Sequence, residues 1–114
     1  MSQETVQKIN NDKDITQIGA IHNGSRSFGP VKFTYSVNTN TETATVAASM
    51  LGVSLGSSTL SLEKPQAQFG GNVSLYNVNA TIAINFQEKK LYGFVDVNMM
   101  GKTIYRGNVT LLDW

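Results

Sequence analysis

The sequence predicts an all-β protein, an antiparallel β-barrel or β-sandwich of about seven or eight short strands. Apolar and polar residues alternate along most of the chain from Val31 onward, as they do in half-buried strands. Turn-forming residues separate the alternating runs at short intervals, and no segment beyond Val31 has the apolar spacing of a helix. Short connections between consecutive strands favour antiparallel pairing.

The first thirty residues lack this alternation. We expect residues 1–30 to form a polar N-terminal arm, loosely packed or partly ordered, ahead of a β domain at residues 31–114. Within the arm, His22-Asn23-Gly24-Ser25 is typical of a loop, and Gly29-Pro30 marks the entry to the first clear strand.

The first half of the domain contains one clear strand and one long uncharged stretch. Residues 31–37 alternate between apolar and polar side chains and predict a strand. Residues 43–62 carry no charge, but their many hydroxyls and glycines make a poor membrane span. The parity of their apolar residues changes near Leu51-Gly52 and near Gly56, which predicts two strands with a tight turn and a bulge.

The second half repeats the pattern. Strands are expected through residues 78–86 and 91–99, and a last strand reaches Trp114. A parity change near Tyr76-Asn77 predicts a bulge there. Further turns are expected at residues 63–66, 70–72, 87–90 and 100–102.

Composition limits the partners. Nine Lys and Arg balance eight Asp and Glu for a net charge of +1, which argues against binding of nucleic acid or an anionic membrane. Only 15% of residues are charged, against about 25% in an ordinary domain. Because an uncharged polar surface repels its neighbours weakly, we expect a homo-oligomer or a protein partner.

The sequence contains no cysteine, which excludes disulfides, thiolate metal sites and cysteine nucleophiles. We see no signal peptide and no transmembrane segment, so the expected location is the cytoplasm by default.

Catalytic and metal-binding patterns are weak. The single histidine, His22, is interpreted as a solvated loop residue, and no Gly-x-Ser-x-Gly nucleophile motif occurs. Asp12 and Asp14 are spaced like the start of a calcium loop, but the expected glycine and glutamate do not follow. We therefore predict no catalytic residue, no cofactor site and no metal site.

A candidate binding face is expected on the strand at residues 91–99. Asp96 is the one acid inside a predicted strand, and a hairpin through Met100-Gly101 brings Arg106 onto its face if Val95 or Val97 pairs with Tyr105. Tyr92 and Phe94 share that face. These four residues are either a surface ion pair beside packing aromatics or a polar anchor in an aromatic-lined site.

The same strand carries a short motif. Lys90, Tyr92, Gly93, Phe94 and Val95 match the pattern of an RNA-stacking strand, so residues 90–97 resemble that strand of RNA-recognition domains. Leu91 stands where that pattern has glycine, Val97 stands where it has an aromatic residue, and the two helices of that fold are not predicted. We interpret Tyr92 and Phe94 as packing or interface residues and expect no nucleic acid partner.

Two functional hypotheses remain open. The first is a non-enzymatic binding or self-assembly module. The alternative is a small barrel with an apolar cavity that binds a hydrophobic small molecule. Such a barrel either carries the ligand or acts on it as a cyclase or isomerase, through the shape of the cavity alone.

Overall fold

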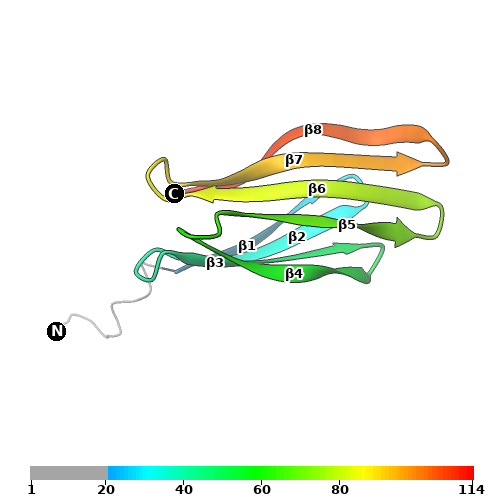
Figure 1. The fold of residues 1–114 in the computed structure, drawn as a ribbon. Coiled ribbons are helices and arrows are strands. Elements are labelled where there is room, and N and C mark those ends of the chain that lie inside the picture. Colours follow the sequence, from blue (N-terminus) through cyan, green and yellow to red (C-terminus); the bar gives the residue numbers. More distant parts are fainter. Residues whose placement is uncertain (1–20) are drawn as a thin grey trace.

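The computed structural model describes residues 21–114, and in it the chain forms eight antiparallel strands in two four-stranded sheets (Figure 1). The strands are β1 (Ile21–Phe28), β2 (Val31–Asn38), β3 (Thr43–Met50), β4 (Val53–Ser61), β5 (Gln66–Val73), β6 (Tyr76–Asn85), β7 (Lys90–Met99) and β8 (Lys102–Asp113). The predicted all-β antiparallel class is confirmed. Among the described residues, no helix is long and apolar enough to cross a membrane.

Each strand pairs with its neighbour in sequence, so the sheet orders are β1-β2-β3-β4 and β5-β6-β7-β8. The chain passes from one sheet to the other between β4 and β5. Within residues 21–114 no strand pairing joins the two sheets, so they are not closed into a barrel. The predicted barrel is therefore wrong, and the arrangement is compatible with the predicted sandwich.

The hydrophobic core lies between the sheets. Alternate residues of β2 point inward as predicted, and Val31, Phe33 and Val37 are fully buried there. The other strands supply further large buried side chains, among them Met50, Leu60, Ile82, Leu91 and Leu111. Burial of this alternate set is the main force that holds the sheets face to face.

Strand β1 corrects the predicted loop at His22–Ser25. All eight of its residues pair with β2. The sequence of β1 does not show an apolar–polar alternation because only one of its four positions opposite buried β2 residues, Phe28, carries a buried hydrophobic residue. The other three positions carry His22, Gly24 and Arg26. Residues 1–20, the rest of the predicted arm, lie outside the described residues.

Contacts to β8 complete the environment of β1. The His22 ring stacks on Trp114 with centroids 6.0 Å apart. Arg26 Nη1 donates a hydrogen bond to the Thr110 carbonyl oxygen at 3.1 Å, and the Phe28 ring lies 5.7 Å from that of Tyr105. Side chains on the inward side of β1 thus bind it to the opposite sheet.

The connections fall into two kinds at opposite ends of the molecule (Figure 1). Two-residue turns at one end join the strands within each hairpin: Gly29-Pro30, Leu51-Gly52, Ser74-Leu75 and Met100-Gly101. Longer connections at residues 39–42, 62–65 and 86–89 lie at the other end, with the C-terminus.

Two local predictions for β5 and β6 are wrong. Residues 70–72 continue β5 and form no turn, and no bulge occurs at Tyr76-Asn77. The parity change there comes from the turn at Ser74-Leu75. A register shift opposite Ser54–Gly56 does confirm the predicted bulge near Gly56.

Two of the tight turns place bulky apolar residues in an unfavourable backbone conformation. Leu51 and Met100 each have φ of 53°, and the glycine that follows each of them has φ of 80°. Two successive positive φ values are typical of a type I′ turn, in which Asn-Gly is the preferred pair. A residue with a Cβ costs about 1–2 kcal/mol in this region.

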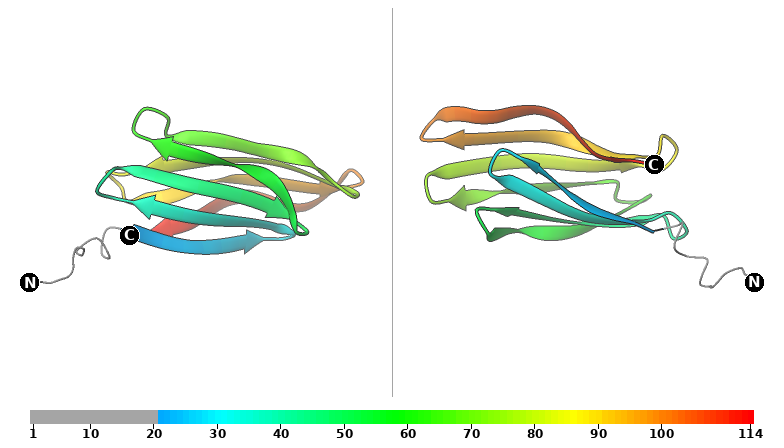
Figure 2. Two further views of the ribbon diagram at one scale, coloured as in Figure 1. Left: turned by 90° about the horizontal axis from the view of Figure 1, so that it is seen from below. Right: turned by 180° about the vertical axis from the view of Figure 1, so that it is seen from behind.

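The second sheet projects beyond the first at the hairpin end (Figures 1 and 2). A Cβ at Gly29, in the β1–β2 turn, would lie 3.6 Å from Tyr105 Cβ and 3.9 Å from Ile104 Cγ2. The β7–β8 hairpin continues past that level to Gly101, three residues further, or about 10 Å of strand. We call residues 73–77 and 98–104 the overhang.

Candidate functional site

The four predicted site residues lie together on the outer face of the second sheet. Tyr92, Phe94 and Asp96 alternate along β7, and Arg106 of β8 is the register partner of Asp96. The aromatic side chains are 37% and 38% exposed. Their use as a binding face stays a prediction.

Arg106 connects the charged and aromatic parts of this face. Its Nη1 lies 4.0 Å from Asp96 Oδ2, and its guanidinium carbon lies 5.8 Å from the centre of the Phe94 ring. Asn98 Nδ2 donates a hydrogen bond to Asp96 Oδ1 at 3.2 Å. Because Arg106 is largely exposed, the ion pair is worth at most about 1 kcal/mol.

A second cation lies beside the other aromatic ring. Lys90 Nζ is 5.8 Å from the centre of the Tyr92 ring. Each aromatic residue of β7 therefore has a basic side chain next to it, at the distance of a weak cation–π contact. The face presents two ring surfaces, two cations and one carboxylate.

Gly93 lets β6 and β7 approach closely between the two aromatic residues. A Cβ there would collide with the Thr81 carbonyl oxygen and lie 3.0 Å from Ile82 Cα. Register shifts between Leu91 and Tyr92 and between Val97 and Asn98 bracket the aromatic segment. The extra residue of each shift, Leu111 and Ile104, belongs to β8, so β8 is the strand that bends and twists more strongly beside this segment.

Amide and hydroxyl groups surround the aromatic pair. Phe94 and Asp96 border a shallow hollow of about 200 Å³ that also contacts Gln68, Asn79 and Thr81. These groups donate and accept hydrogen bonds, but none is a general base in contact with a nucleophile. The chemistry of the face suits binding by contact and hydrogen bonding.

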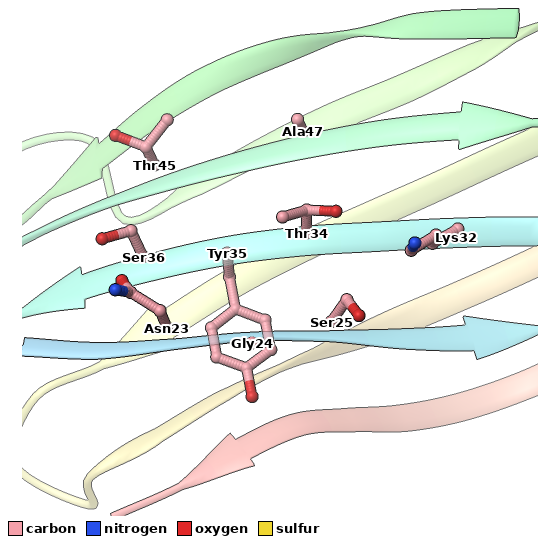
Figure 3. A pocket seen from close by; sticks show the side chains of 9 residues that line it. All are labelled: Asn23, Gly24, Ser25, Lys32, Thr34, Tyr35, Ser36, Thr45 and Ala47. Carbon is pink, nitrogen blue, oxygen red and sulfur yellow. The ribbon is translucent and has the colours of Figure 1, made fainter. Parts of the chain in front are cut away.

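A larger hollow of about 680 Å³ lies on the outside of the first sheet (Figure 3). Its lining consists mostly of short polar side chains, including Asn23, Ser25, Thr34, Ser36 and Thr45. The Tyr35 ring crosses β1 at Gly24, where a Cβ would lie 2.5 Å from its hydroxyl oxygen. The hollow is wide and open, and it contains no acid or histidine.

The remaining catalytic and metal candidates are not drawn together. His22 belongs to β1 and stacks on Trp114. Within residues 21–114, no three His, Cys, Asp or Glu side chains form a group suited to a metal ion. Asp12 and Asp14 lie outside the described residues.

The overhang was not predicted as a surface feature. Leu75 and Met100 occupy its two turns, and the Met100 amide donates a hydrogen bond to the Leu75 carbonyl oxygen at 3.3 Å. The available signal was a bulky apolar residue before glycine at a predicted turn, where Asn is the favoured residue.

Comparison with protein families, curated proteins and solved structures found no match to this chain.

Proposed function

We propose that the protein is a non-enzymatic self-assembly module whose partner is a second copy of the same chain, bound through the outer face of β6, β7 and β8. The observation that supports this proposal is the Asp96–Arg106 pair beside the half-exposed rings of Tyr92 and Phe94. Aromatic residues and arginine are enriched at protein interfaces.

Symmetry favours a second copy over an unrelated protein. A two-fold interface brings the same surface patch of both subunits together, so the patch must complement itself. A face with one carboxylate and one guanidinium meets this condition, because Asp96 of each copy can pair with Arg106 of the other. A face of one charge sign would repel its own copy.

The size of the face is compatible with a dimer. Three strands about 4.8 Å apart and about ten residues long offer roughly 480 Å² in projection. A standard interface buries about 800 Å² of accessible surface per partner. Accessible surface follows the relief of the side chains, so it is larger than the projected area of the same face. The low charge of the chain, 15% of residues, also reduces repulsion between copies.

A charge-swap experiment tests the proposal. Asp96→Arg places two arginines against each other across the interface, and Arg106→Asp places two carboxylates against each other. Each variant alone should sediment as a monomer at concentrations where the wild type is a dimer. An equal mixture should recover a heterodimer, detected by native mass spectrometry from the difference in mass.

Lys32→Asp on the first sheet is the matched control, since it reverses one charge on the opposite outer face and should leave the dimer unchanged. A wild-type protein that stays monomeric at its highest workable concentration would contradict self-association. Dimerisation that survives both single swaps would place the interface elsewhere.

A further inference from the structure

The overhang carries two prominent apolar side chains side by side. Leu75 is 59% exposed and Met100 is 77% exposed, and the hydrogen bond between their backbones fixes the two turns next to each other. Scattered exposed apolar residues are ordinary on protein surfaces. Here they stand at the tips of two adjacent hairpins, in a segment that also contains Val73, Met99 and Ile104.

The backbone at one of these two residues is unfavourable for an apolar side chain. Met100 adopts a φ of 53° in a turn where Asn would be relaxed, and its side chain is 77% exposed. Met100 therefore gains little burial at a strained position, and an outlier of this kind motivates a functional hypothesis.

The total charge argues against an anionic partner for the molecule as a whole, but the acidic groups are concentrated at one end. Of the five acidic residues described, Asp96 pairs with Arg106, and the other four lie at the end with the longer connections together with three lysines: Glu42, Glu63, Glu88 and Asp113, with Lys64, Lys89 and Lys90. The overhang contains one ionisable group with a charge at neutral pH, Lys102. Lys32 follows the neighbouring turn of the first sheet.

We propose that the overhang docks on the surface of an anionic lipid bilayer. Leu75 and Met100 enter the boundary between headgroups and acyl chains, and Lys102 contacts the anionic headgroups. Lys32, on the first sheet behind the overhang, adds longer-range attraction to them. Amphipathic helices at a membrane surface bury their apolar face about 5–10 Å deep, and the overhang projects far enough, about 10 Å, to reach the same depth. Basic residues beside the apolar contact add attraction to anionic lipid.

This docking is independent of the proposed dimer. The overhang lies at the end of the sheets, whereas the dimer face lies on the outside of β6, β7 and β8. Failure of one proposal therefore leaves the other standing.

The experiment is flotation of the full chain with vesicles of phosphatidylcholine containing about 30% phosphatidylserine, compared with phosphatidylcholine alone. The wild type should bind the anionic vesicles, and binding should weaken as salt is raised. Met100→Asn and Leu75→Ser should each reduce binding by about tenfold or more. Met100→Asn should also raise the melting temperature, because Asn tolerates the turn, so its loss of binding cannot come from unfolding.

Leu62→Ser and Lys64→Gln are the matched controls at the opposite end of the molecule. Leu62→Ser removes an apolar side chain that is 62% exposed and should leave vesicle binding unchanged. In the overhang, Lys102→Gln should weaken binding to anionic vesicles several-fold, whereas the control Lys64→Gln should not weaken it.

Any of four results would overturn the proposal. The first is that the wild type does not float with anionic vesicles, the second is that Met100→Asn binds as well as the wild type, and the third is that Leu62→Ser weakens binding as much as Leu75→Ser. If Met100→Asn instead abolishes self-association without any vesicle binding, the overhang contacts a second copy and the lipid assignment is wrong.

Discussion

The two long sides of the pair of sheets are closed in different ways. On the β4–β5 side the chain itself passes from sheet to sheet, and backbone hydrogen bonds hold the connection: Ser61 N to Lys64 O at 2.9 Å and Ile84 N to Pro65 O at 2.8 Å. On the β1–β8 side the described contacts are made by side chains, from residues about eighty positions apart. The first side depends on local sequence, and the second depends on a few particular side chains.

This difference predicts how each side responds to mutation. A change on the β4–β5 side leaves the covalent connection in place, so the sheets stay near each other. A change on the β1–β8 side removes contacts that nothing else replaces. The following substitutions test that contrast, beginning with the core that both sides share.

Val46→Asp should abolish folding. Val46 is fully buried in β3, and a carboxylate there would have no partner. The expected cost exceeds about 4 kcal/mol, a large part of the stability of an ordinary domain. Loss of the cooperative thermal transition in circular dichroism is the expected result, and a melting temperature near wild type would refute the position of Val46 in the core.

Phe28→Ala should destabilise the β1–β8 side by about 3 kcal/mol or more. Phe28 is buried, and the centre of its ring lies 6.2 Å from that of Phe33 and 5.7 Å from that of Tyr105. Leu55→Ala is the counterpart on the β4–β5 side, where Leu55 is only partly buried. Urea unfolding should show the larger loss for Phe28→Ala, and equal losses would remove the contrast between the sides.

Gly24→Ala should cost about 1–3 kcal/mol, because the new methyl group collides with the Tyr35 ring on the neighbouring strand. Tyr35→Leu in the same chain should recover part of this loss, since it removes the atoms that collide. The measurement is a double-mutant cycle of unfolding free energies. Independent effects of the two substitutions would contradict the close approach.

Arg26→Gln should have the smallest effect, about 1 kcal/mol. It removes the hydrogen bond to the Thr110 carbonyl oxygen and the contact of the guanidinium with the Phe28 ring, whose centre lies 5.6 Å away. Amide exchange in β1 should accelerate more than exchange in β4. Uniform acceleration across both strands would argue against a local role.

Much of the fold follows from local patterns in the sequence. Alternation identified β2, β7 and the strand pair around Leu51-Gly52, because burial on one face imposes a period of two. The pairing of Asp96 with Arg106 was expected only on the condition that Val95 or Val97 pairs with Tyr105. The structure meets this condition through the register shift between Val97 and Asn98, because an uninterrupted two-residue hairpin would place Asp96 opposite Tyr105.

The rest depended on contacts that local patterns do not contain. β1 carries Gly24 and Arg26 at inward positions, and these become favourable only through Tyr35 and Thr110, which lie on other strands. The projection of the second sheet is likewise a property of how the sheets stack, and strand lengths alone do not give it. For the candidate face, the sequence predicted the four residues and their position on one side of the sheet. The contact of Arg106 with the Phe94 ring could be seen only in the structure.

The consecutive pairing of strands has a consequence for the kinetics of folding. Within residues 21–114, every hydrogen-bonded ladder joins strands that are neighbours in sequence. Each hairpin therefore forms by closing a short loop, and hairpin formation takes about 1–10 μs. Contacts between β1 and β8 close a loop that contains almost all of the described residues, so their loop-closure entropy cost is larger than that of any hairpin. We therefore expect two four-stranded meanders to form first and their docking along β1 and β8 to be the slow step.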